Sequence, residues 1–301
     1  MKTLTICIPA YNEEKNIERL LVILLKQQIP KNYCLRLIII ASDGSSDNTV
    51  NIVKEIAKKN KNVKLLDFKK REGKTKLMNI FFRSANEDIL VMLDADVLPE
   101  NEFTIANLIL PFSQDANIAL VSGNPKPIDK KYGLVGRASI FSYKLQKYLK
   151  ENLRGGNNFY GCHGRILALK KRFYKSTKMP VETSINDGQL YLDCKEKKFD
   201  FVFISTAVVF YKPPTTVKDF LKQSQRFRLN SRIMERFPSM KDEINIPKFF
   251  FLKGFLKNLR SDPVGGLTWA IIYNYGLCLP SKKDALAATW SISDSTKELD
   301  N

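Results

Sequence analysis

Short, almost wholly apolar runs recur along the first half of the chain, separated by longer stretches of mixed polarity. Runs such as LRLIIIA and DILVML contain hardly any polar residues, which is typical of strands buried on both faces of a parallel sheet. We therefore predict strands at Leu4–Ile8, Leu35–Ala41, Val63–Phe68, Ile89–Leu93 and Ile118–Val121.

Helical spacing of apolar residues fills the intervals between these runs. Asn12–Gln28 carries one apolar stripe, with Asn12 as its predicted N-cap, and Asp47–Asn60 and Lys74–Ala85 follow. This alternation of strand and helix predicts an α/β fold with a doubly wound, mostly parallel central sheet, right-handed crossovers and helices on both faces.

The second half is less regular. Its patterns predict helices at 134–152, 187–198 and 217–236, and a strand pair at 166–170 and 199–211. Residues 237–301 contain several prolines and are predicted to form a C-terminal helical appendage.

Two neighbouring segments of that appendage raise the question of membrane contact. The stretch VGGLTWAIIYNYGLCL between Pro263 and Pro280 is shorter than the roughly 20 apolar residues of a spanning helix, so it is predicted to be buried or interfacial. The preceding stretch, FFFLKGFLKNLR, mixes phenylalanines with Lys253, Lys257 and Arg260. Such a helix can lie on a membrane surface or pack on the domain, and the pattern leaves both open.

Composition excludes several classes of protein. The 301 residues are 44% hydrophobic and 27% charged, which is ordinary for a globular protein and argues against wholesale disorder. The five cysteines never form a C-x-x-C pair, which argues against a disulfide framework or a zinc site and favours a reducing compartment. The apolar run before Pro9 is too short for a secretory signal.

Charge is concentrated in two blocks. The formal net charge is +18, and residues 126–178 carry a net +12 while residues 212–260 carry a net +8. Such blocks attract polyanionic partners, whether nucleic acid, an anionic membrane face or a phosphorylated substrate. A solvated, lysine-rich surface is the alternative.

Ligand-capable side chains follow four successive predicted strands. In open α/β sheets, ligands bind beyond the carboxyl ends of the strands, so these side chains are expected to share one edge. Two carboxylates one residue apart after a buried strand suit a hard divalent cation that shares phosphate oxygens, Mg²⁺ or Mn²⁺. An isolated D-x-D is also common in capped turns, and its position after ILVML is what favours the cation. The residues concerned are Pro9, Tyr11, Glu13, Asp43, Lys74, Asp94 and Asp96.

The motifs PAYNEE, SDGSSDNT, REGK and DAD, in this order, resemble those of family 2 glycosyltransferases with the GT-A fold. FYGCHGRILALKKRF at 159–173, Asn186-Asp187 and QRFRL at 225–229 resemble the branch of cellulose, chitin and hyaluronan synthases, whose box reads Q-x-x-R-W. The resemblance implies a catalytic domain over 1–236. Its nucleotide-sugar-binding half would be 1–125 and its acceptor-binding half 126–236, with 237–301 as an appendage at a membrane interface.

The resemblance also implies a role for each matching residue. Asp187 would be the general base, Asp94 and Asp96 would meet the metal, and Cys162 and His163 would lie at the acceptor. We expect His163 to have a structural or acceptor-lining role and not a catalytic one. The nucleotide-sugar would be bound by Pro9, Tyr11, Glu13, Asp43, Lys74, Asp94, Asp96, Gln225, Arg226 and Arg228.

Three positions depart from the family pattern. Ser42 replaces an aspartate, Asn186 replaces a glutamate, and Leu229 replaces the tryptophan of the box. The last departure argues against a processive polymerase and favours a single addition.

These features predict an inverting, metal-dependent glycosyltransferase that uses a nucleotide-sugar, UDP-linked by expectation. Its acceptor would be a saccharide or a polyprenyl or other lipid-linked molecule at the membrane surface. The expected location is cytoplasmic, peripheral at the inner face of the cell membrane and in contact with anionic lipid. The alternatives are a catalytically inactive partner subunit and a basic nucleic-acid-binding protein. No usual nucleic-acid motif is present, so nucleic acid is not an expected partner.

Overall fold

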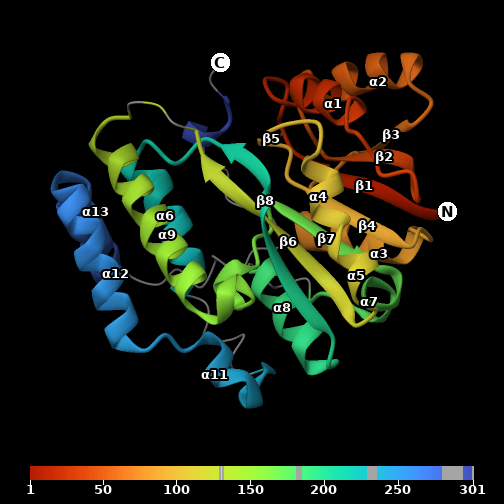
Figure 1. Ribbon diagram of the computed structural model, residues 1–301. Coiled ribbons are helices and arrows are strands. Elements are labelled where there is room, and N and C mark those ends of the chain that lie inside the picture. Colours follow the sequence, from red (N-terminus) through yellow and green to blue (C-terminus); the bar gives the residue numbers. More distant parts are fainter. Residues whose placement is uncertain (129, 131, 181–184, 229–235, 280–293, 300–301) are drawn as a thin grey trace.

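Strands and helices alternate through the first half of the chain, as the apolar pattern predicts. The computed structural model describes residues 1–128, 130, 132–180, 185–228, 236–279 and 294–299. The elements of the first half (Figure 1) are β1 (Lys2–Ala10), α1 (Ile17–Leu25), β2 (Tyr33–Asp43), α2 (Thr49–Lys59), β3 (Val63–Phe68), α3 (Lys74–Ser84), β4 (Ile89–Leu93), β5 (Val97–Pro99), α4 (Thr104–Ile109), α5 (Pro111–Gln114) and β6 (Ile118–Pro127).

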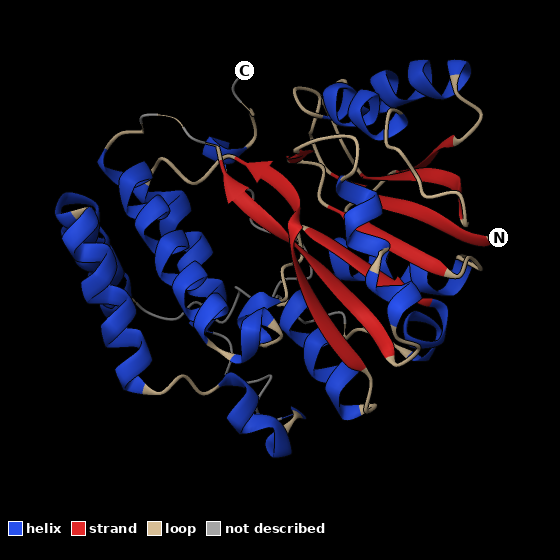
Figure 2. Ribbon diagram, viewed as in Figure 1, coloured by secondary structure: helices blue, strands red, loops and turns tan. Residues whose placement is uncertain are grey.

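Helices dominate the second half (Figure 2). The predicted helix at 134–152 forms as α6, and the predicted helix at 217–236 forms as α9 as far as residue 228, beyond which 229–235 lie outside the described residues. The elements are α6 (Leu134–Asn152), β7 (Ile166–Lys170), α7 (Lys171–Ser176), α8 (Asn186–Glu196), β8 (Asp200–Tyr211), α9 (Val217–Arg228), α11 (Lys241–Ile244), α12 (Lys248–Ser261) and α13 (Pro263–Cys278), with single 3₁₀ turns at Arg154–Gly156, Phe159–Gly161, Pro238–Met240 and Asp294–Thr296.

Among the residues that the structure describes, eight strands form one mostly parallel sheet, in the order β3-β2-β1-β4-β7-β6-β8-β5. The strands β3, β2, β1 and β4 are parallel neighbours, so their carboxyl ends meet at one edge. β7 is antiparallel to both β4 and β6, and β8 is parallel to β6. Since β6 lies between β7 and β8, the predicted pairing of 166–170 with 199–211 is wrong. The connection from β7 to β8 through α7 and α8 is long enough to pass β6.

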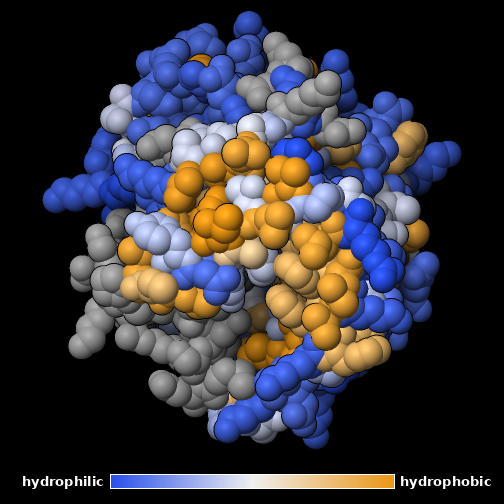
Figure 3. Space-filling model, turned by 90° about the vertical axis from the view of Figure 1, so that its left-hand side faces the viewer, coloured by the Kyte–Doolittle hydropathy of each residue, from blue (hydrophilic) through white to orange (hydrophobic). Residues whose placement is uncertain are grey.

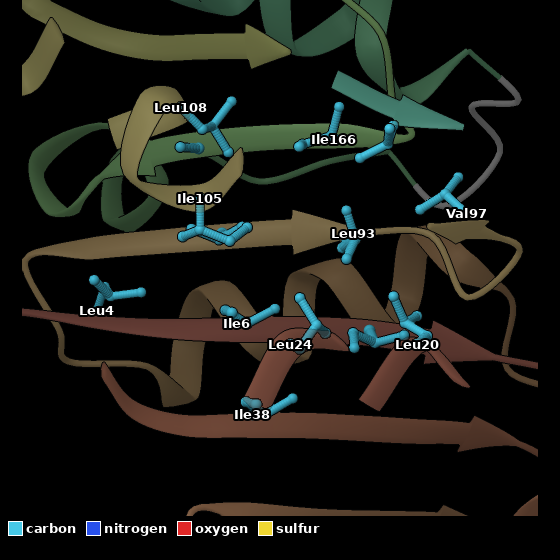
Figure 4. Packing of buried hydrophobic residues seen from close by; sticks show 14 of the residues in the cluster. Leu4, Ile6, Leu20, Leu24, Ile38, Leu93, Val97, Ile105, Leu108 and Ile166 are labelled. Atoms are coloured by element: carbon cyan, nitrogen blue, oxygen red, sulfur yellow. The ribbon is translucent and has the colours of Figure 1, made fainter. Parts of the chain in front are cut away.

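Helices cover both faces of the sheet, as expected for alternating side-chain directions along a strand. On one face, Leu4, Ile6 and Ile8 of β1 belong to a cluster with residues of α1, α2, α4 and α5. Figure 4 shows part of this cluster, with Leu4 and Ile6 labelled. On the other face, Cys7 of the same strand belongs to a cluster with α3, α7 and α8. The fold is thus the predicted α/β class.

A third layer of helices stands beside the sheet (Figure 1). α6, α9, α12 and α13 enclose their own apolar cluster around Phe141, Phe220 and Trp269. The segment at 249–260 packs on the domain through Gly254 of α12, which lies close against Tyr148 of α6. Leu252 stays exposed, and contact with a membrane surface remains a prediction. Within the described ranges, no helix has the length and apolar character needed to cross a bilayer.

The predicted N-cap at Asn12 is wrong, because α1 begins only at Ile17. Asn12 adopts a left-handed backbone conformation, with φ of 51°. Its side-chain oxygen accepts the Ser46 backbone N–H at 2.8 Å, and its own N–H donates to Ser45 Oγ at 3.1 Å. Asn12 therefore links the loop after β1 to the loop after β2 and does not cap a helix.

Candidate active site

The carboxyl ends of β1, β2 and β4 border a cavity of ≈ 590 Å³. The cavity extends to α8 and to the third helical layer. The predicted site residues with described side chains all line this cavity. They are Pro9, Tyr11, Glu13, Asp43, Lys74, Asp94, Asp96, Cys162, His163 and Asp187. Gln225, Arg226 and Arg228 belong to α9, but their side chains, like all of Leu229, lie outside the described part of the chain.

Asp43, at the end of β2, organises the loop that leads into α3. Its carboxylate accepts the backbone N–H groups of Glu72 at 2.6 Å and Gly73 at 3.2 Å. Gly73 has φ of 85°, a conformation that glycine adopts without strain. Arg71 of the same loop stacks on the Tyr11 ring, 3.9 Å from its centroid. This part of the cavity thus presents an aromatic and cationic surface beside a carboxylate, which suits a nucleoside and its phosphates.

The two carboxylates of the D-x-D pair have different surroundings. Lys74 pairs with Asp94 and also donates to Gly164 O at 3.3 Å. Asp96 makes no hydrogen bond or ion pair with any described residue. Burial and the nearby Asp94 carboxylate raise the pKa of Asp96. Burial, followed by repulsion from Asp96, raises the pKa of Glu13 to about 7. Three carboxylates, those of Glu13, Asp94 and Asp96, therefore lie near one another at this end of the cavity, together with the cations Lys74, Arg165 and Lys297.

A divalent cation fits this arrangement. Three clustered His, Cys, Asp or Glu ligands are not found among the residues that the structure describes. Mg²⁺ does not need them, because it keeps several waters and is commonly held by one or two carboxylates together with substrate phosphates. An unpartnered carboxylate at a cavity wall, with its neighbour one residue away, supplies that kind of ligand set.

Asp187 lies in the cavity wall, in the first turn of α8. Its carboxylate accepts the Gly164 N–H at 3.0 Å and the Gly188 N–H at 2.9 Å. The side chain of the preceding Asn186 accepts the Thr75 hydroxyl at 2.9 Å, so this departure from the family pattern ties α8 to α3. The backbone donors hold Asp187 in one orientation toward the cavity.

The single histidine stays uncharged at physiological pH. His163 donates its backbone N–H to Ser122 Oγ at 3.0 Å. Burial, with smaller contributions from the cations Lys150 and Arg165, lowers the pKa of His163 to about 3. A neutral, cavity-lining side chain fits the expected structural or acceptor-lining role.

Three cationic residues of the cavity were not among the predicted site residues. Arg71 and Arg165 belong to the quoted motifs REGK and FYGCHGRILALKKRF, so those motifs could have indicated both residues. The Arg165 guanidinium lies 4.0 Å from the centroid of the Tyr211 ring. Lys297 donates to Tyr11 O at 2.5 Å and pairs with Glu13, 284 residues earlier in the chain. No local pattern could have revealed a contact over that separation.

A buried lysine of α6, Lys150, is expected to make stability depend on pH. Lys150 donates to Asn124 Oδ1 at 3.1 Å and lies 4.1 Å from the Phe203 centroid. Burial lowers its pKa from 10.5 to about 8. Between pH 8 and pH 10.5, Lys150 is protonated in the unfolded chain but neutral in the folded protein. The free energy of unfolding should therefore increase as the pH rises through this range.

The Lys150→Met variant should lack this increase. Relative to the variant, the wild type should gain about 3 kcal/mol between pH 8 and pH 10.5. Urea unfolding of both proteins across this range measures the difference, and identical pH profiles would contradict the placement of Lys150.

Comparison with known proteins shows a family whose sequence pattern matches much of the chain. The model of Glycosyl transferase family 2 matches residues 5–176, more than half of the chain. A poly-beta-1,6-N-acetyl-D-glucosamine synthase from Staphylococcus epidermidis is 29% identical over 226 residues, covering 73% of this chain and 52% of that protein. A second one from the same species is 25% identical over 274 residues, covering 88% and 62%. The chain thus spans between half and two thirds of the length of these relatives.

Solved structures show the same fold. The mannosyltransferase PcManGT from Pyrobaculum calidifontis, solved with GDP-Man and Mn²⁺, aligns with a TM-score of 0.60 at 18% identity and covers 92% of this chain and 76% of that one. TarS from S. aureus aligns with a TM-score of 0.52 at 18% identity and covers 87% and 72%. The chain therefore has the GT-A architecture of glycosyltransferases.

Proposed function

The chain belongs to glycosyl transferase family 2, and from this premise we propose that it transfers a sugar from a nucleotide-sugar to a hydroxyl or phosphate of an acceptor. The reaction would depend on a divalent cation and would invert the anomeric carbon. The observation that carries the proposal is the meeting of the strand-end carboxylates and Asp187 in one cavity.

The nucleotide would lie along the ends of β1 and β2. Tyr11, Glu13 and Asp43 would hold the nucleoside, with Pro9 beside them. Lys74 would approach the diphosphate, as would Arg226 and Arg228 from α9. The GDP-Man bound by PcManGT and the poly-N-acetylglucosamine made by the staphylococcal relatives show that relatives of this fold and family differ in substrate. UDP is the nucleotide that we propose here.

The metal site would consist of Asp96 with Asp94 beside it. Mg²⁺ or Mn²⁺ bound there would offset the negative charge that develops on the leaving diphosphate. Asp96 is suited to this because it has no partner of its own in the described structure, whereas Asp94 is held by Lys74. Burial, followed by repulsion from the Asp94 carboxylate, raises the pKa of Asp96, and a bound cation would offset that repulsion.

Asp187 would act as the general base. As the acceptor oxygen forms its bond to the anomeric carbon, the bond from that carbon to the diphosphate breaks, and Asp187 takes the acceptor's proton. Attack from the face opposite the diphosphate gives inversion. The backbone N–H groups of Gly164 and Gly188 keep the carboxylate oriented for this transfer, and general-base help is typically worth about 10²–10⁴ in rate.

The acceptor would be a saccharide or a lipid-linked molecule presented at a membrane surface. Exposed apolar side chains on α12 and α13 and the two basic blocks of the second half support a peripheral location at the inner face of the cell membrane. Leu229 stands where the family box has a tryptophan, and this replacement favours the addition of one sugar per acceptor.

A donor screen tests the proposed function. The protein is incubated with UDP-sugars and GDP-sugars in the presence of Mn²⁺ or Mg²⁺, and release of nucleoside diphosphate is measured. We expect release from a UDP-sugar that stops when EDTA is added. A folded protein that binds no nucleotide and releases none from any donor would contradict the proposal and favour an inactive partner subunit.

A further inference from the structure

Part of the cavity is bounded by the third helical layer and not by the sheet. We call this part the apolar arm. Three serines there also line the cavity: Ser139, Ser142 and Ser224. Ser139 donates to Pro214 O at 2.7 Å and Ser224 to Phe220 O at 2.9 Å, so two of the three hydroxyl hydrogens are already used. The apolar side chains of the arm come from α6, α9, α12 and α13: Tyr143, Leu145, Phe220, Phe251, Trp269 and Tyr273.

Packing of aromatic rings holds the arm in shape. Trp269 stacks on Tyr273, with ring centroids 4.8 Å apart and an interplanar angle of 15°. On its other sides Trp269 packs against Phe141 at 5.8 Å and Phe255 at 5.9 Å. Trp269 itself is buried. The arm is therefore preformed, as sites for apolar ligands usually are.

The arm continues to the molecular surface at a hydrophobic face. Phe251 lines the cavity and is also 40% exposed, and Tyr273 is 36% exposed. Figure 3 looks onto this side of the molecule, where hydrophobic side chains gather in a broad patch with hydrophilic borders. The exposed apolar residues on the two helices include Phe249, Leu252 and Leu256 of α12 and Val264, Leu267, Ile271 and Leu277 of α13.

Charge around this face favours a lipid surface over another apolar protein. α13 has no charged residue between Pro263 and Cys278, while Lys253, Lys257 and Arg260 of the adjoining α12 are exposed. Large exposed apolar patches are uncommon on monomeric proteins and mark interaction sites. Helices with an apolar face and a basic border bind anionic bilayers.

We propose that the apolar arm binds the hydrocarbon chain of an amphiphilic acceptor, which enters from an anionic bilayer lying against α12 and α13. The polar head of the acceptor reaches Asp187, and its chain passes Phe251 and Tyr273 toward the lipid. Gln146 and Gln223 also line the cavity and could hold a sugar, but a sugar chain would not account for the opening of the arm at Phe251 and Tyr273 onto an apolar face. The position of the head rests on the proposed function, but binding of the chain in the arm does not.

Tryptophan fluorescence tests the arm without any donor. The chain's two tryptophans are Trp269 and Trp290, so a Trp290→Phe background isolates the one that lines the cavity. Farnesyl phosphate should change the Trp269 emission and bind tighter than dimethylallyl phosphate by about tenfold or more, because its longer chain buries more apolar surface. Both probes carry the same phosphate head, so the comparison isolates the chain.

Two matched variants on α12 locate the binding. Phe251→Asp places a charge where the arm opens and should weaken farnesyl phosphate binding by about tenfold or more. Phe249→Asp, at a more exposed position that does not line the cavity, should leave the affinity unchanged. Unchanged melting temperatures show that both variants fold.

Three results would overturn the proposal. They are equal affinities for the two phosphates, equal losses in the two variants, and tighter binding of chitotetraose than of farnesyl phosphate. The last would assign the arm to a glycan held by Gln146 and Gln223, which also line the cavity. Titration of the same protein with UDP and Mn²⁺ separates this test from the proposed function. If the protein does not bind the nucleotide, the proposed function is contradicted, but binding of the hydrocarbon chain in the apolar arm is not.

Discussion

Replacing Asp187 with asparagine should slow sugar transfer by about 10²–10⁴-fold and leave nucleotide affinity unchanged. The amide keeps the shape of the carboxylate and can still accept a hydrogen bond from Gly164 or Gly188, but it cannot take a proton from the acceptor. Steady-state release of nucleoside diphosphate gives the rate, and calorimetric titration with UDP and Mn²⁺ gives the affinity.

Asp193 provides the control for this substitution. It lies on the same helix, α8, is buried and pairs with Lys197 at 3.5 Å, and it does not line the cavity. Asp193→Asn should therefore leave the transfer rate near that of the wild type. Near-normal transfer by Asp187→Asn would mean that another group is the base, and an equal loss in both variants would point to a general effect on α8.

Replacing Asp96 with asparagine should remove the part of nucleotide binding that depends on metal. The wild type should bind UDP more tightly with Mn²⁺ than without it. The variant should lose about 3 kcal/mol of this binding free energy, or more than a hundredfold in affinity, because the cation loses its charged ligand. Titrations with and without Mn²⁺ measure both values.

The control is an aspartate on the same sheet but away from the cavity. Asp67 of β3 pairs with Lys69 at 2.7 Å, and Asp67→Asn changes the net charge by the same amount. It should keep the metal dependence of the wild type. If Asp96→Asn keeps it as well, the metal role of Asp96 is wrong.

Local apolar patterns predicted the parallel half of the sheet well. Ile89–Leu93 was predicted from one apolar run and forms β4 with the same bounds, because a strand buried on both faces must be apolar throughout. The convergence of the strand ends followed from the parallel order alone. The predicted roles of the residues there, and the division of the chain after residue 236, remain predictions.

Features that depend on distant contacts could not be predicted in this way. Asn12 has the composition of an N-cap, but its side chain bonds to the loop around Ser46, and this competing partner is invisible to helix periodicity. The position of β6 between β7 and β8 depends on how the chain crosses the sheet. Lys297 reaches Glu13 from the far end of the sequence, where no spacing rule applies.

In the proposed site, one cavity holds a cation between the D-x-D pair and a nucleotide diphosphate. Anomalous scattering from Mn²⁺ in crystals of the protein grown with UDP would locate that cation. We expect a single strong peak beside the Asp96 carboxylate, with the diphosphate as its other neighbour and the nucleoside near Asp43. A nucleotide bound in this cavity with no manganese at Asp96, or a nucleotide bound elsewhere on the molecule, would contradict this proposal.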